Sequence, residues 1–311
     1  MSFDPRQQRV TAAGLLVALG IIYGDIGTSP LYVMKSILGE RPIDELLVLG
    51  GISCVAWTLT IQTTIKYIFL TLRADNRGEG GIFSLYALVR RYAWWAFIPA
   101  TIGASTMMAD GIITPPISVS SAVEGLVNVR GLDRWFEPGS NVTVAVVVVI
   151  LSGIFIFQRF GTKVVGTAFG PVMGVWFSML LVLGLVAVVE HPDILRALSP
   201  HYAIKLLTEY PQGFWLLGGV FLCTTGAEAL YSDLGHVGRK NIQSSWGFVK
   251  LALLMNYLGQ GAWALHEGGE VLNRRNPFYA LMPDWFLLPG VIIPTRARSS
   301  LARRSSPGAS P

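Results

Sequence analysis

The chain has 311 residues, of which 52% are hydrophobic and only 14% are charged. A soluble domain usually carries about 25% charged residues, and the mean hydropathy here is +0.51. Five apolar stretches have no charge over about the 20 residues that a helix needs to cross a bilayer. They are residues 46–65, 92–109, 141–158, 164–189 and 210–227. The composition excludes a soluble globular protein and predicts an all-α polytopic membrane protein.

The net charge of +5 comes mostly from the last stretch, residues 294–311, which holds four arginines and no acid. The rest of the chain is near neutral, so no basic patch for nucleic acid is expected. Both cysteines, Cys54 and Cys223, lie inside apolar stretches. We interpret them as small core residues, because a disulfide framework or a zinc site needs closer spacing and partners.

The apolar segments, taken in chain order, predict seven spanning helices and part of an eighth. They are expected at residues 12–38, 46–70, 95–126, 141–158, 164–189, 212–235 and 246–266, followed by 279–293. Basic residues next to the spans favour a cytoplasmic N-terminus, with Arg90, Arg91, Arg159 and Lys163 as the strongest signals. The short amphipathic stretch 80–91 is expected to lie at the cytoplasmic interface or to begin the third helix.

A glycine-rich stretch, residues 73–81, precedes this amphipathic segment. A phosphate-binding loop follows a strand and opens a helix in an α/β unit, and no such unit is predicted here. We therefore interpret residues 73–81 as a turn. The sequence also has neither Gly-x-Ser-x-Gly nor His-Glu-x-x-His. We expect no enzyme activity and no cofactor.

Acidic residues inside predicted spans are the strongest functional signals. A charge within the bilayer is costly, so it usually marks an ion or proton site. Asp25, Asp110 and Glu228 lie within predicted spans, and Glu124, near the end of its span, is a weaker fourth candidate. A kinked helix with a buried, protonated acid is the alternative interpretation of Asp25.

Asp25 belongs to a stretch in which two glycines and Pro30 interrupt an apolar helix. Pro30 frees a carbonyl four residues earlier, and such breaks are tolerated at membrane depth where they line a cavity. Thr225 and Glu228 flank a second break at Gly226. Breaks in the first and sixth segments are typical of an inverted five-plus-five repeat, although the internal sequence similarity is too weak to establish it.

A polar stripe is predicted on the third helix. Asp110, Thr114 and Ser118 are spaced i, i+4 and i+8, which places three oxygen-bearing side chains on one face. Pro115 and Pro116 are expected to bend the helix beside them. The alternative is that these hydroxyls only satisfy neighbouring backbone groups.

Five motifs, in order, resemble the KUP/HAK/KT family of potassium-uptake transporters. They are residues 20–32, 73–81, 110–125, 157–162 and 225–236, and the resemblance extends from about residue 11 to 293. Pro116 departs from the family pattern, in which alanine is frequent. The resemblance implies an incomplete LeuT-like inverted-repeat fold of the amino acid–polyamine–organocation superfamily. It also implies potassium:proton symport at the inner membrane by a multi-pass protein, and a cytoplasmic C-terminal domain that this chain lacks. A homodimer of the full-length family is left open.

The same resemblance, transferred residue by residue, assigns the site. The implied cation ligands are Asp25, Tyr32, Asp110, Thr114, Ser118, Thr225 and Glu228. Potassium itself is expected at Asp25 and Asp110, and proton coupling at Glu228 and Asp110. An amino-acid or other cation carrier of the same fold is the alternative function. An acid in the first break would repel a substrate carboxylate, which favours potassium.

We therefore divide the chain into a cytoplasmic N-terminus (1–10), a partial transporter domain (11–293) and an Arg/Ser/Pro-rich tail (294–311). The tail is expected to be disordered. Its composition is typical of GC-rich DNA read in a wrong frame, so the chain is expected to be a truncated or frameshifted product that is inactive alone. A genuine basic tail at the membrane surface is the alternative. The gene sequence past Ile293 distinguishes them.

Overall fold

The computed structural model describes residues 10–128, 136, 140–158, 163–266, 271–272 and 276–283. Within these ranges the regular structure is helical, apart from an isolated bridge between Asn76 and Glu79. This confirms the all-α expectation. The N-terminal segment 1–9, most of the motif 157–162, the predicted span beyond residue 283 and the tail 294–311 lie outside the described residues.

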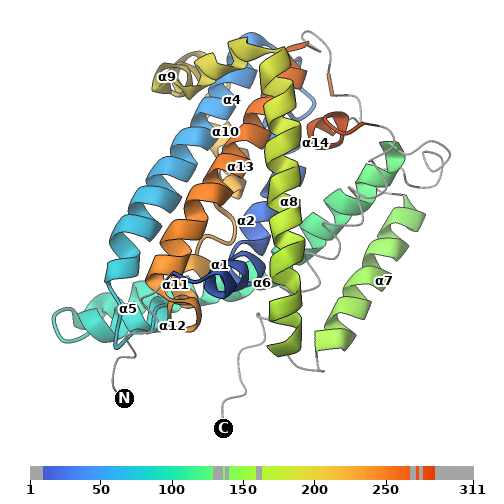
Figure 1. Ribbon diagram of the computed structural model, residues 1–311. Coiled ribbons are helices and arrows are strands. Elements are labelled where there is room, and N and C mark those ends of the chain that lie inside the picture. The colour runs from blue at the N-terminus through green and yellow to red at the C-terminus, as the bar shows by residue number, and fades with distance from the viewer. Residues whose placement is uncertain are drawn as a thin grey trace.

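The helices follow one another closely along the chain (Figure 1). The first half contains α1 (Ala12–Ile21), α2 (Gly24–Thr28), η2 (Ser29–Leu31), α3 (Val33–Leu38), α4 (Glu45–Thr58), η3 (Leu59–Leu70), η4 (Thr71–Arg73), α5 (Ile82–Val89), η5 (Trp94–Ala96), α6 (Phe97–Glu124) and η6 (Gly125–Asn128). The second half contains α7 (Asn141–Gln158), α8 (Lys163–Glu190), η7 (Pro192–Leu198), α9 (Pro200–Glu209), α10 (Gly213–Phe221), η8 (Leu222–Thr224), α11 (Ala229–Ser232), α12 (Leu234–Val237), α13 (Arg239–His266) and α14 (Pro277–Ala280).

The main bundle is built from α4, α8, α10 and α13, with α1 and α2 packed within it (Figure 1). Tyr23, at the junction of α1 and α2, is fully buried and stacks on Trp246 of α13 with ring centroids 6.1 Å apart. Its hydroxyl donates to the carbonyl of Ile242 at 2.7 Å. The ring of Phe177 in α8 lies nearly perpendicular to that of Tyr23, with ring centroids 6.4 Å apart. This aromatic packing fixes the start of the first helix break between α8 and α13.

The C-terminal part of α6 lies beside α7, to one side of the main bundle (Figure 1). Val119 and Val123 of α6 are buried against Val146 and Val147 of α7. Over the rest of its length α6 is largely exposed, and no residue of its most apolar window is buried. Only the C-terminal part of α6, from Thr114 onward, is therefore enclosed by the described structure.

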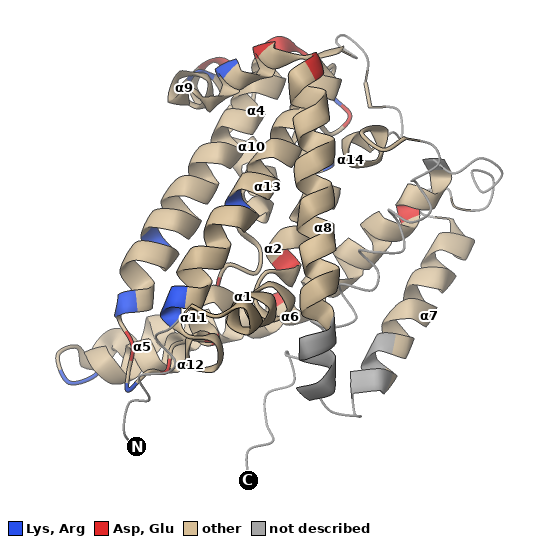
Figure 2. Cartoon of the chain, viewed as in Figure 1, with Lys and Arg blue, Asp and Glu red and all other residues tan. Residues whose placement is uncertain are grey.

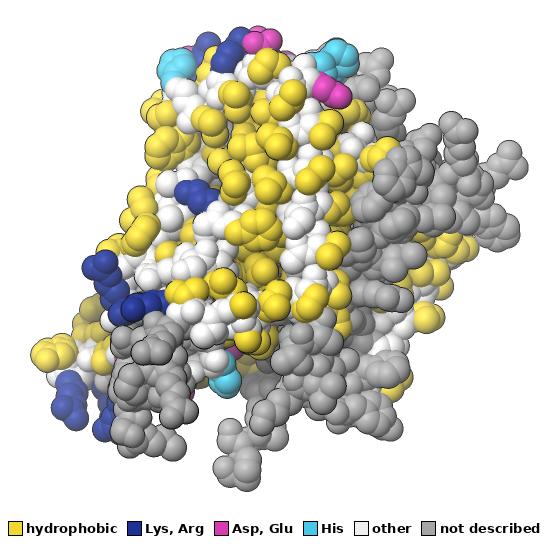
Figure 3. Space-filling view, viewed as in Figure 1, with side chains coloured by type: hydrophobic (Ala, Val, Ile, Leu, Met, Phe, Trp, Pro, Cys, Tyr) yellow, Lys and Arg dark blue, Asp and Glu magenta, His cyan; other side chains and the backbone are white. Residues whose placement is uncertain are grey.

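Charge and apolar surface are arranged as a membrane protein requires. Charged residues gather toward the two ends of the bundle, with few between them (Figure 2). A broad apolar band covers the face in between (Figure 3). On α8, Val175, Val182 and Val189 are exposed at intervals of seven residues and form one outward stripe of the helix. Such a stripe is stable facing lipid, which supports an integral membrane protein.

The expected number of spans is wrong. Among the described residues, four helices are long and apolar enough to cross a membrane, and the bent pair α1–η2 raises the number to five. The four are Glu45–Arg73, Trp94–Val127, Phe169–Glu190 and Gly213–Ser232. The segment 141–158 contributes only a shorter apolar helix. α13 is long, but Asn241, Ser245, Asn256 and Gln260 are buried in it, so its composition is that of a core helix.

The expected LeuT-like inverted repeat is also wrong for this structure. The four or five spans among the described residues provide no second set of five helices to match a first set. Of the predicted eighth span, the described part contains only the four residues of α14. The two helix breaks that suggested the repeat are nevertheless present, and they adjoin in space.

Candidate cation site

The first helix break is formed as the sequence predicts. Segments Ala12–Ile21 and Gly24–Leu31 meet at 64°. Pro30 lies in η2 and has no amide hydrogen to offer Ile26, so the chain cannot continue as a regular α-helix. Asp25, in the first turn of α2, is half buried. The break therefore places a carboxylate inside the bundle.

Side chains from three distant elements hold this break in place. The donors are Trp176 Nε1 to Gly27 O at 2.8 Å, Gln260 Nε2 to Pro30 O at 3.0 Å and Asn276 Nδ2 to Leu31 O at 2.7 Å. The carbonyl of Asp25 accepts from the hydroxyls of Thr28 and Ser29, at 3.0 and 3.3 Å. These four carbonyls already accept hydrogen bonds, which fix their directions and leave the side-chain oxygens as the more adaptable ligands for a cation.

The second break separates α10 from α11. The chain passes through η8 and then residues 225–228 before α11 begins at Ala229. Gly226 has φ +83°, a conformation that favours glycine. A Cβ placed on Gly226 would lie 2.3 Å from the Cβ of Asp25. The two breaks therefore meet at Asp25 and Gly226, and Gly226 has no room for a side chain.

The polar stripe of α6 forms the third wall of the site. Thr114 Oγ1 donates to Asp110 Oδ1 at 2.7 Å. Thr114 and Ser118 are buried, whereas Asp110 is half buried. α6 continues as one helix through Pro115 and Pro116. η2 contacts both α6 and η8, so the stripe adjoins the two breaks.

Three carboxylates share this region. Glu228 lies within electrostatic range of both Asp110 and Asp25, so their negative charges repel one another. Tyr32 is buried at the end of the first break, and its hydroxyl lies 3.3 Å from Ser29 Oγ. Thr225 is half buried in the second break. The seven predicted ligand residues thus lie on the two breaks and the adjoining helix α6.

The fourth acid has a different environment. Glu124 forms an ion pair with Lys35, with 2.6 Å between Nζ and Oε2. The donors Trp176, Gln260 and Asn276 were not predicted, because the predicted site residues were acids and hydroxyl-bearing residues that could bind a cation. Their signal was available: Trp176 and Gln260 carry polar groups inside helices that were predicted to be embedded in the membrane.

The chemistry of the site suits a hard cation. Its side chains provide carboxylate and hydroxyl oxygens, which are the ligands that alkali and alkaline-earth cations prefer. Over the described ranges, no group of three or more His, Cys, Asp or Glu has the geometry to hold a metal ion. The fold defines an integral membrane protein in which carboxylate and hydroxyl side chains gather where two broken helices meet.

Comparison with known proteins identifies the family. Residues 12–299 match the family described as the K+ potassium transporter integral membrane domain. The match covers most of the chain, and the chain therefore belongs to this family. No solved structure matches it.

Curated relatives are similar over nearly the whole chain. Proteins named "Probable potassium transport system protein Kup" from Cytophaga hutchinsonii and Flavobacterium psychrophilum are 59% and 56% identical over 295 residues. The protein of that name from Clostridium perfringens is 51% identical over 300 residues. Each alignment covers 93% of this chain, but only 44% or 45% of the relative. The chain thus spans less than half the length of these relatives.

Proposed function

We propose that this chain forms the cation-binding part of a potassium-uptake transporter. Relatives that share half or more of its residues carry potassium transport in their names. The observation that supports the proposal most directly is the contact of the two helix breaks at Asp25 and Gly226. This contact gathers oxygen ligands inside a membrane-embedded bundle, and potassium is bound in proteins by oxygens that replace its water shell.

The proposed ligands have distinct roles. Potassium lies between Asp25 and Asp110, whose carboxylates offset its charge. The hydroxyls of Tyr32, Thr114, Ser118 and Thr225 complete the oxygen cage together with Glu228. An amino-acid substrate is disfavoured, because the negative charge of the three carboxylates would repel the carboxylate of the amino acid.

Transport is proposed to be coupled to protons. Three carboxylates that repel one another favour a state in which they retain a proton, and a bound cation relieves that repulsion. Cation binding then favours proton release, with Glu228 and Asp110 as the coupling groups.

We place the protein in the inner membrane. We give it a cytoplasmic N-terminus, because exposed Arg90 and Arg91 flank the start of α6.

Equilibrium binding of isotopic potassium to the purified, detergent-solubilised chain tests the proposed function. Asp25→Asn keeps the size of the side chain and removes its charge, so we expect the affinity to fall about tenfold or more, equivalent to ~1.4 kcal/mol. Asp193→Asn is the matched control, because Asp193 is exposed on η7 and remote in sequence from both breaks. Binding by Asp25→Asn that equals binding by the control and the unmodified chain would refute the site. Circular dichroism checks that each variant is folded.

A further inference from the structure

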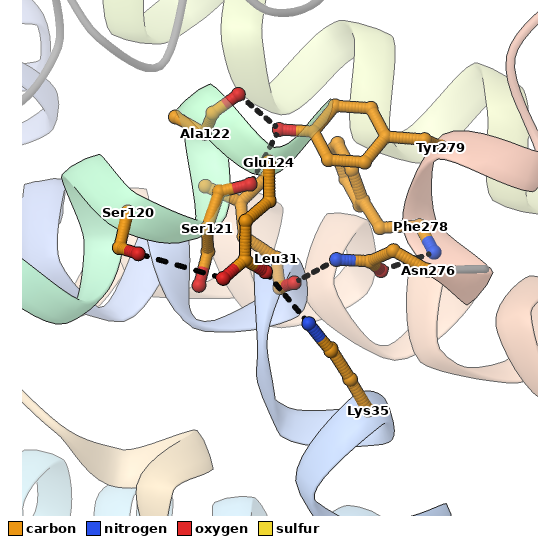
Figure 4. Close-up of polar contacts among 9 residues, drawn as sticks. All are labelled: Leu31, Lys35, Ser120, Ser121, Ala122, Glu124, Asn276, Phe278 and Tyr279. Carbon is orange, nitrogen blue, oxygen red and sulfur yellow. Dashed lines mark hydrogen bonds and ion pairs between the residues drawn. The ribbon is translucent and has the colours of Figure 1, made fainter. Parts of the chain in front are cut away.

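An ion pair ties together the two elements that carry the candidate ligands. Lys35 of α3 and Glu124 at the end of α6 are 89 residues apart in sequence, yet their charged groups lie 2.6 Å apart (Figure 4). Lys35 is 36% exposed and Glu124 is 20% exposed. Ser120 Oγ lies 3.5 Å from the other carboxylate oxygen of Glu124. The pair joins the chain that follows the first break to the helix that carries Asp110.

The segment that begins α14 makes a second connection between the same elements (Figure 4). Asn276 Nδ2 donates to the carbonyl of Leu31 in η2 at 2.7 Å. The hydroxyl of Tyr279 donates to the carbonyls of Ser121 and Ala122 in α6, at 3.2 and 3.3 Å. α14 therefore bridges η2 and α6 beside the ion pair.

Close packing accompanies these polar contacts. A Cβ placed on Gly125, directly after Glu124, would lie 2.2 Å from the ring of Tyr279. Phe278 packs on Trp176 with ring centroids 5.8 Å apart, and Trp176 in turn holds the carbonyl of Gly27 in the first break. The end of α6, α14 and the first break thus form one connected unit.

The ion pair lies away from the proposed cation. Along α6, Glu124 is about 9 Å from Ser118 and about 21 Å from Asp110, at 1.5 Å per residue. Lys35 and Glu124 therefore influence the site through the spacing of η2 and α6. An ion pair this exposed contributes little stability, so it can open and close repeatedly.

We propose that Lys35 and Glu124 are positioning residues that close the candidate cation site on its α14 side. The inference rests on the proposed cation site. With the pair formed, η2 and α6 are held together, and the buried hydroxyl of Ser118 is protected from that side. With the pair broken, the end of α6 keeps its polar contacts through α14 but loses its direct tie to α3, so it separates from α3 and η2 more often and the site opens there.

Thiol accessibility tests this closure without requiring transport. Ser118→Cys is introduced with Cys54→Ala and Cys223→Ala, and its labelling by a charged methanethiosulfonate reagent is timed in the purified chain. Ser118 is 1% exposed, so labelling is expected to be slow. Lys35→Gln or Glu124→Gln is expected to accelerate it about two- to fivefold, the range for losing a partly exposed ion pair.

Further variants separate closure from a general loss of structure. Lys35→Arg keeps the charge and should keep the protection, and the reversed pair Lys35→Glu with Glu124→Lys should restore it. Lys205→Gln is the matched control, because Lys205 pairs with Glu209 within α9 at 3.8 Å and joins no second element. Unchanged labelling in both single variants, or reversed charges that fail to restore protection in a folded protein, would overturn the proposal. Since labelling needs no potassium, a failure to bind potassium would count against the proposed function alone.

Discussion

In the proposed function, Glu228 is the residue through which cation binding and protonation would be most directly linked. It lies at the second break, within electrostatic range of Asp25 and Asp110. No basic residue occurs between Tyr210 and His236, so no neighbour in sequence offsets its charge. A bound cation is then the natural counter-charge. By linkage, a proton held by this group is released as potassium binds.

Glu228→Gln should reduce that release. The purified chain in weakly buffered solution is expected to acidify the medium when potassium is added, and a pH-sensitive dye reports the change. Glutamine cannot give up the proton, so the variant should release fewer protons per bound potassium than the unmodified chain. Glu40→Gln, at an exposed position in the loop before α4, is the control. Proton release by Glu228→Gln as large as in the control would assign the coupling to another group.

For single residues, the sequence predicted the acidic members of the candidate site better than the residues that contact them. Asp25 and Glu228 stood out because a carboxylate inside an apolar segment is costly without a function. The contact of Asp25 with Gly226 could not be read from the sequence, since it depends on how two remote segments pack. The same holds for Gln260, whose amide reaches a carbonyl 230 residues away. Polar donors of this kind satisfy freed carbonyls, and only the tertiary structure shows which ones.

Among the elements, the glycine-rich loop 73–81 contacts the helix α11 that follows the second break. The loop is closed locally by the Asn76–Glu79 bridge and by the Asp75 carboxylate, which accepts from the amide of Gly78 at 2.9 Å. The hydroxyl of Tyr231 in α11 donates to the carbonyl of Ala74. The loop therefore packs on the short helix that directly follows Glu228, and the interpretation of 73–81 as a turn is confirmed.

Gly80→Ala should disturb this packing. A Cβ on Gly80 would lie 1.9 Å from the carbonyl oxygen of Tyr231, which is a backbone atom and cannot rotate away. We expect a loss of about 1–3 kcal/mol in the free energy of unfolding, the usual range for overpacking. Thermal unfolding in detergent measures it. Gly218→Ala is the control, because an added methyl there meets no atom within 4 Å. Equal unfolding temperatures for the two variants would contradict the contact.

The elements also show where hydrophobic patterns are a sufficient guide and where they fail. The amphipathic stretch 80–91 is a helix, α5, as its pattern predicts. The seventh predicted span, now α13, is not among the helices that are apolar enough to cross a membrane. Its polar residues Asn256 and Gln260 are buried in the core, and the sequence alone did not show which face of this helix would be buried. The pairing of Lys35 with Glu124 was equally hidden, because neither residue indicates its partner across 89 positions.

For the whole molecule, the described helices form a site with one open wall. The main bundle encloses the two breaks, whereas α6 is exposed over most of its length. The site is therefore most enclosed where η2, α14 and the end of α6 meet. Under the proposed function, the cation would lie between the main bundle and a helix that is packed mainly at one end.

The central claim is that two broken helices meet to form a potassium site. Anomalous diffraction from crystals of the purified chain grown in rubidium tests it most directly, because rubidium substitutes for potassium and can be located by its own scattering. We expect an anomalous peak bounded by Asp25, Asp110 and Glu228, beside Gly226. A peak elsewhere in the bundle with none at this position, or no ordered rubidium at a concentration that saturates binding, would contradict it.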